Sequence, residues 1–244
     1  MKKLIFASAI ILSSSLVHAQ GLKGLLSKAG DAAKSTGLSK KSSTNLSNDE
    51  IVAGLKDALR VGSDKAASKV SVADGFFKDA VIKILMPEEA QKAEQKLRAI
   101  GLSKQVDNAI LSMNRAAEDA AKSAAPIFAK AVREMSFNDA LSILRGSNDA
   151  ATTYLKQKTS AALTDAFRPV IESSLEKVNA TKYWNTVFTS YNKFSADKVN
   201  PDLKAYVTEK ALSGIFYQLA QEEKDIRKNP AARTTEILKK VFGS

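Results

Sequence analysis

The residues most able to bind a polar ligand or move protons fall in two short stretches. In "MNRAAE", Asn114, Arg115 and Glu118 lie within one helical turn, because helix positions three and four residues apart are neighbours. In "QEEKDIRK", Glu223 precedes Arg227 by four residues, the order that favours an ion pair along a helix. Carboxylates and arginines in this pattern could clamp a polar or anionic ligand, or carry out acid–base chemistry.

These groups have two interpretations. On the first, they line a polar cleft in which arginines donate forked hydrogen bonds to a ligand. On the second, which we favour, they form an internal ion-pair network that pins the C-terminal helices to a central helix, since buried charges need partners. The C-terminal region would then be a structural latch first. The candidate residues for either role are Asn114, Arg115, Glu118, Arg145, Arg168, Glu222, Glu223, Arg227 and Arg233.

Composition excludes several other chemistries. The chain has no cysteine, and its single histidine is His18. Loss of residues 1–19 would leave neither imidazole nor thiol, which excludes Ser-His-Asp and Cys-His catalysis, zinc on those ligands, and disulfides. The "SNDE" stretch lacks calcium-loop spacing. We therefore predict no metal, no cofactor and no catalytic residue. We expect a non-enzymatic helical scaffold of the cell envelope that binds a polar or anionic ligand, an apolar ligand or a protein partner. The alternative is an enzyme that uses carboxylates and arginines on an envelope component.

The first 46 residues differ from the rest. Lys2 and Lys3 precede an apolar run that ends at Ala19, the pattern of a cleavable secretory signal peptide over residues 1–19. Residues 20–46 are rich in Gly, Ser, Lys and Ala, which predicts a flexible basic leader. We expect export to the periplasm, where the partner would be an unidentified ligand or an envelope protein.

The charge of the chain is strongly positive. The formal net charge of +11 falls to +9 when Lys2 and Lys3 are removed, and much of the remainder lies in residues 20–46. Outside the cytoplasm, an anionic membrane surface is the obvious attractive partner, whereas nucleic acid is not expected there. Ordinary solubilising charge is the simpler interpretation. A structural factor held at the membrane by its leader is thus a further alternative.

After residue 46 the patterns predict helices. Ser47 and Glu50 form a capping box at the start of an apolar-periodic run. Over residues 103–135, apolar residues and alanines recur every three or four positions, which predicts a central Ala-rich helix that neighbouring helices can approach closely. Pro126 predicts a kink or break in it, and Pro169 is expected near the start of a new helix.

No segment combines strand alternation with hairpin turn chemistry. Residues 81–85 could form a short strand, but we favour a short helix or a buried extended piece that ends at Met86. A last helix is expected from Pro230 onward. We predict an all-α fold: a single multi-helix domain over residues 47–244, with about eight or nine helices around the central Ala-rich helix.

One group of aromatic residues has its own two interpretations. It occurs at mixed helical spacing in "TKYWNTVFTSYNKF". These side chains could line an apolar ligand pocket between helices, but such sets more often form core. They are Tyr183, Trp184, Phe188, Tyr191 and Phe194.

Taken together, the segments resemble the DUF4197 family of uncharacterised bacterial proteins. The matching stretches include "MNRAAEDAAKSAAPIFAKAV", "MSFNDALSILRG", "AATTYL", "FRPVIE" and "DLKAYVTEKALSGIFYQLAQEEKDIRKNPAARTTEILKKVFG", with "LKDAL" and "KILMP" earlier. The similarity covers nearly all of residues 47–243. It implies an exported helical protein of Gram-negative bacteria, and it implies no particular activity.

Overall fold

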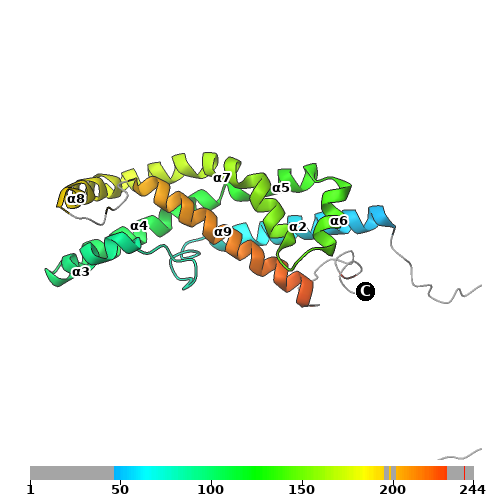
Figure 1. Cartoon of the computed structure of the whole chain (residues 1–244), viewed down its shortest axis with the longest axis horizontal. Helices are drawn as coiled ribbons and strands as arrows, with labels where there is room; N and C mark the ends of the chain where they lie inside the picture. Colours follow the sequence, from blue (N-terminus) through cyan, green and yellow to red (C-terminus); the bar gives the residue numbers. More distant parts are fainter. Residues whose placement is uncertain (1–46, 195–197, 199–201, 230–238, 240–244) are drawn as a thin grey trace, which may run out of the picture. The chain divides into compact units, whose positions relative to one another are not determined.

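The computed structural model describes residues 47–194, 198, 202–229 and 239, all within the unit Leu46–Ser244. Over these residues the chain forms eight α-helices and a short 3-10 helix, with no strand, which confirms the all-α prediction (Figure 1). The elements are α2 (Asn48–Val70), η1 (Glu88–Ala90), α3 (Gln91–Ala99), α4 (Ser103–Ala121), α5 (Ala124–Glu134), α6 (Phe137–Arg145), α7 (Ala150–Lys177), α8 (Ala180–Phe194) and α9 (Leu203–Lys228).

Two helices begin at capping boxes. The Ser47 backbone N–H donates to the Glu50 carboxylate at 2.8 Å, and the Glu50 N–H donates back to the Ser47 hydroxyl at 3.2 Å. Ser136 and Asp139 repeat this exchange at the start of α6. Each pair satisfies two backbone donors that the first turn of a helix leaves without partners. The predicted start at Ser47 is confirmed.

The two prolines behave differently. The predicted break near Pro126 is confirmed, because α4 ends at Ala121 and α5 starts at Ala124. The expectation that Pro169 lies near the start of a helix is wrong, since Pro169 lies inside the continuous α7. Leu163, Phe167 and Ile171 are fully buried on either side of this proline, so packing holds the helix together although one backbone hydrogen bond is lost.

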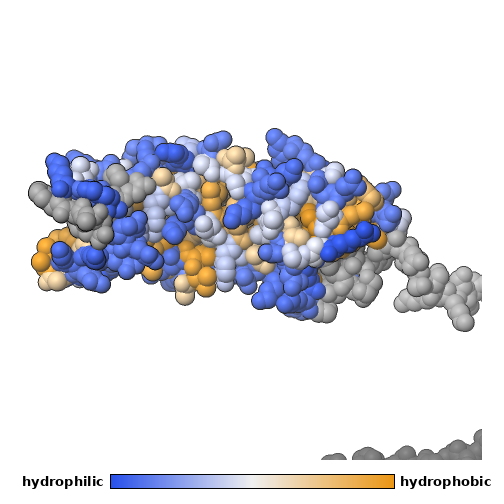
Figure 2. Space-filling view, in the orientation of Figure 1, coloured by the Kyte–Doolittle hydropathy of each residue, from blue (hydrophilic) through white to orange (hydrophobic). Residues whose placement is uncertain are grey.

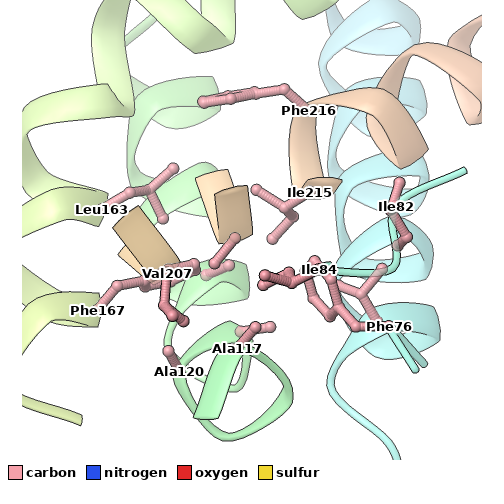
Figure 3. Packing of buried hydrophobic residues seen from close by; sticks show 14 of the residues in the cluster. Phe76, Ile82, Ile84, Ala117, Ala120, Leu163, Phe167, Val207, Ile215 and Phe216 are labelled. Atoms are coloured by element: carbon pink, nitrogen blue, oxygen red, sulfur yellow. The ribbon is translucent and has the colours of Figure 1, made fainter. Parts of the chain in front are cut away.

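The core forms where α4, α7 and α9 pack against one another, and α2 joins it by packing against α9 and α5. The C-terminal half of α4 contributes several small side chains to this core, and Ala116, Ala117 and Ala120 are fully buried. Small side chains allow the backbones of neighbouring helices to approach closely. Larger groups from the other helices, including Phe167, Val207 and Ile215, fill the space above them (Figure 3). The predicted central Ala-rich helix is confirmed.

Between α2 and η1 the chain forms no long helix, and we call residues 71–86 the connecting segment. It starts with a sharp turn in which Asp74 has a φ of 71°. Gly75 follows, and a Cβ there would lie 2.7 Å from the Lys69 and Val70 carbonyl oxygens, so no larger residue fits. Ile82 and Ile84 then turn inward with Phe76 toward the helical core (Figure 3). Residues 83–86 form no helix, and Ile84 and Met86 are buried whereas Val81 and Leu85 are exposed, so the piece predicted here is buried on one side only.

The close contact between the connecting segment and α9 makes a prediction. A Cβ at Gly214 would lie 2.4 Å from the ring of Phe76, which is fully buried and cannot move aside. We expect Gly214→Ala to lower the free energy of unfolding by about 1–3 kcal/mol, the usual cost of overpacking. Urea unfolding followed by circular dichroism measures the change.

Gly62→Ala is the matched control. Its Cβ would meet the flexible end of Ile226 at 3.3 Å and the Glu222 Cβ at an ordinary contact distance of 4.0 Å, while the helix gains about 1 kcal/mol of intrinsic propensity. Its expected effect is therefore neutral or stabilising. Equal losses of stability in the two variants would contradict a specific clash between Gly214 and Phe76.

Candidate functional site

Glu118 holds the start of the connecting segment. Its Oε1 accepts hydrogen bonds from the backbone N–H groups of Phe76 and Phe77, at 3.0 and 3.1 Å. Its Oε2 accepts from the Arg115 guanidinium at 2.6 Å. The carboxylate is buried, and two backbone dipoles and one cation offset the cost of removing its charge from water. The carboxylate thus accepts from backbone N–H groups that have no hydrogen-bond partner in a helix or a sheet.

Asn114 holds the end of the same segment. Its side-chain oxygen accepts from the Ile84 N–H at 2.8 Å, and its NH₂ group donates to the Ile84 carbonyl at 2.8 Å. The second hydrogen of the amide is donated to the Ile110 carbonyl at 2.8 Å. The side chain is fully buried and imitates a neighbouring strand. Together, Asn114 and Glu118 place the connecting segment on α4 by hydrogen bonds at both ends.

Arg115 links this site to the turn before it. Its guanidinium donates to Asp74 at 2.6 Å as well as to Glu118. Asp74 also pairs with Lys78 at 2.8 Å. The Lys78 ammonium, followed by the Arg115 guanidinium, holds the pKa of Asp74 below its ordinary value. The aspartate therefore stays ionised and fixes the turn to α4.

Two further anchors come from α9. The Gln218 side chain donates to Asp79 at 2.7 Å and accepts from the Lys69 ammonium at 2.8 Å. Tyr206 donates its hydroxyl to the Leu85 carbonyl at 2.8 Å. Burial raises the pKa of this hydroxyl to about 12. None of Asp74, Asp79 and Gln218 was among the sequence candidates.

A second cluster surrounds Glu223 on α9. Its carboxylate accepts from the N–H groups of Ala151 and Thr152, at 3.0 and 2.8 Å, and from the Thr152 hydroxyl at 2.8 Å. It therefore caps the start of α7 from a distant helix. Arg227 pairs with Glu223 at 2.9 Å and donates to the Ile143 carbonyl near the end of α6. Two helix ends are thus bound to α9 by one ion pair.

The other sequence candidates lie elsewhere. Glu222 is buried and pairs with Lys65 of α2 at 2.6 Å, separate from Glu223. Arg145 is exposed at the end of α6, and Arg168 pairs with Asp202 at 3.3 Å. Arg233 lies outside the described residues, as does most of the helix expected from Pro230.

The structure therefore gathers five of the nine predicted residues into two clusters with different partners: Asn114, Arg115 and Glu118 on α4, and Glu223 and Arg227 on α9. The α4 cluster secures the connecting segment, and the α9 cluster secures the ends of α6 and α7. Both buried carboxylates accept hydrogen bonds from the protein itself, through the Phe76 and Phe77 amides and the Ala151 and Thr152 amides. A ligand-binding role for either cluster stays a prediction.

A separate, apolar cleft lies between α3, α4 and α8. It has a volume of about 670 Å³, in the range of small-molecule sites. Trp184 and Phe188 form one wall, with ring centroids 4.3 Å apart, and both are buried. The side chains of the other three predicted aromatic residues, Tyr183, Tyr191 and Phe194, are not among those that the structure describes. The residues that line the cleft are Met86, Ala90, Glu94, Leu97, Leu102, Gln105, Val106, Asn108, Ala109, Leu111, Ser112, Met113, Val178, Ala180, Trp184, Phe188 and Leu203.

The packing of the helices explains why a cleft forms there. α3 packs on α4 and η1, whereas α8 packs on α7 and α9. The two helices that form the walls of the cleft, α3 and α8, thus pack against different neighbouring helices. Part of α4 stays uncovered between them. Both helices lie at the same end of the helical unit in Figure 1. The visible face of the molecule is mostly hydrophilic, with hydrophobic areas at the α3 end and at several places along the rest of the face (Figure 2). Ile100, just after α3, is 72% exposed.

The described part of the chain lacks two other kinds of feature. No group of three or more His, Cys, Asp or Glu side chains is arranged to hold a metal ion there. No helix in the same part is both long enough and apolar enough to cross a membrane.

Comparison with known proteins gives one match. A family model described as "Protein of unknown function (DUF4197)" matches residues 45–243. No curated protein and no solved structure matches the chain.

The Glu118 site makes a prediction. Glu118→Ala should lower the free energy of unfolding by roughly 3 kcal/mol, the low end of the range for breaking a buried pair. The low end applies because the Arg115 side chain is 39% exposed, so water can solvate it once its partner is removed. The stranded amides of Phe76 and Phe77 make up much of the loss. Urea unfolding measures it.

Glu118→Gln is the control, since its side-chain oxygen can still accept from both amides. We expect it to lose only about 1 kcal/mol. Equal destabilisation by the two substitutions would show that the backbone amides do not depend on this acceptor.

The Tyr206 site predicts a pH dependence. The pKa of Tyr206 rises from 10.0 to about 12 on folding, because burial disfavours the phenolate and Glu89 and Glu209 oppose its charge. The folded state then holds this proton more tightly than the unfolded chain does. The stabilisation is complete below about pH 10 and is lost as the pH rises toward 12. The free energy of unfolding should fall more steeply in this window for the wild-type chain than for Tyr206→Phe. Parallel curves would contradict the assignment.

Proposed function

Because the chain belongs to the DUF4197 family, for which no function is known, we propose a function from its own geometry. The protein is a non-enzymatic helical scaffold that binds a hydrophobic small molecule in the cleft between α3, α4 and α8. The observation that carries the proposal is the cleft of about 670 Å³ with an aromatic wall at Trp184 and Phe188. Clefts of this size with mainly apolar linings are the usual form of small-molecule sites.

The polar clusters support a binding protein over an enzyme. A general acid or base must reach the substrate proton that it moves. Glu118 and Glu223 instead direct their oxygens at backbone amides and at Arg115 and Arg227. Their geometry supports a framework that keeps helices and the connecting segment in place. On this framework, the cleft provides the surface that binds the ligand.

The proposal includes export. The pattern of residues 1–19 supports a cleavable signal peptide, and residues 20–46 support a basic leader in the mature chain. The protein would act in the periplasm, where hydrophobic molecules need a carrier or receptor in water. The leader would favour encounters with anionic membrane surfaces.

The chain carries its own reporter for the test, because Trp184 is its single tryptophan and lines the cleft. The probe is the uncharged dye N-phenyl-1-naphthylamine. We expect it to become fluorescent on binding and to quench Trp184 emission by energy transfer. Ala109→Leu, which adds bulk to the partly buried floor of the cleft, should weaken binding roughly tenfold, equivalent to about 1.4 kcal/mol.

Ala162→Leu is the matched control, because Ala162 is exposed on α7 and does not line the cleft. It should bind the dye as the wild-type chain does. Absence of dye binding to the wild-type chain, or equal binding by the Ala109 variant, would rule out the cleft as the site.

A further inference from the structure

The exposed side of α4 presents two parallel stripes to the cleft. Val106, Ala109 and Met113 are spaced by three and four residues, and they form an apolar stripe next to the core. A polar residue stands one position before each of these three residues. Gln105, Asn108 and Ser112 therefore form a polar stripe beside the apolar one. The lining of the cleft is amphiphilic along the length of one helix.

The polar stripe has unused hydrogen-bonding capacity. The side-chain amides of Gln105 and Asn108 form no hydrogen bond with any described residue, and both are exposed. The Ser112 hydroxyl donates to the Asn108 carbonyl at 2.8 Å, so its oxygen can still accept. Two neutral amides and one neutral acceptor thus face the space in which a ligand would lie.

Charge within the cleft is already balanced. Glu94 is the one charged residue among the described lining residues. Its carboxylate pairs with the Arg98 Nε at 2.9 Å. The same guanidinium pairs with Asp107 of α4 at 2.8 Å, which also ties α3 to α4. Among the described lining residues, an anionic head group would therefore meet no uncommitted cation, and a cationic one would meet a carboxylate that is already paired.

From these observations we infer that the cleft selects an uncharged amphiphile. Its neutral polar head bonds to Gln105 and Asn108, and its hydrophobic part lies against Trp184 and Phe188. Desolvating a charged head without a partner is costly, so the cleft discriminates against carboxylate and ammonium analogues of the same chain length. The inference rests on the proposed function, since it names the ligand class of the same cleft.

The test uses three amphiphiles with the same ten-carbon chain, below their micelle concentrations at about pH 8, where a carboxylic acid is ionised. They are 1-monodecanoylglycerol, decanoate and decyltrimethylammonium. Each displaces N-phenyl-1-naphthylamine from the wild-type protein while Trp184 emission is followed. We expect the monoglyceride to bind at least about tenfold more tightly than either ion.

The outcomes separate the two proposals. Equal or tighter binding of decanoate or of the ammonium compound overturns the inference, although the cleft would remain a hydrophobic site. Failure of the dye itself to bind the wild-type protein overturns the proposed function and this inference together. Binding of the dye without displacement by the monoglyceride overturns the inference alone.

A gain-of-function variant provides an independent check. Gln105→Lys places an uncommitted ammonium on the polar stripe and should improve decanoate binding roughly tenfold, while monoglyceride binding falls. Gln95→Lys is the control, because Gln95 is exposed on α3 and does not line the cleft. The same improvement in both variants would show that decanoate responds to overall charge, and would contradict recognition by the α4 stripe.

Discussion

The structure depends on a buried carboxylate that takes the place of a missing backbone partner. Turns inside the connecting segment pair some of its amides, such as that of Lys78 with the Asp74 carbonyl. The amides of Phe76, Phe77 and Ile84 instead donate to side chains of α4. Glu118 supplies the acceptor at one end, and Asn114 supplies both donor and acceptor at the other. Glu223 does the same for the start of α7. Side chains from one element thus complete the backbone hydrogen bonding of another throughout this fold.

Much of the fold could be predicted from local chemistry. The capping box at Ser47 and the break near Pro126 depend on neighbouring residues, and both were found where the sequence placed them. Pro169 was misjudged because its effect depends on distant packing: fully buried Phe167 and Ile171 keep α7 continuous through the proline. Local rules describe how helices start, whereas the continuity of a long helix is decided by what it packs against.

The candidate residues were recognised as buried charges, but their partners were not. Backbone amides of the connecting segment and of α7 carry no signal in a sequence, so the roles of Glu118 and Glu223 as acceptors could not be read from spacing. Gln218 was missed although a signal existed. It shares the buried stripe of α9 with Ile215 and Glu222, at spacings of three and four residues, where a polar residue requires an explanation.

The cleft and the polar clusters divide the molecule into a fixed part and an adaptable part. In the fixed part, the charged and amide side chains of the α4 and α9 clusters are paired with other groups of the protein. The adaptable part is the cleft, where α3 and α8 leave α4 partly uncovered. The contact between Gly214 and the Phe76 ring has a consequence for how the fixed part opens. The ring packs directly on the backbone of α9, so detachment of the connecting segment would expose both the fully buried ring and the helix surface beneath it. The two should therefore open and close as one cooperative unit, although the whole of α9 follows the segment by more than a hundred residues in the chain.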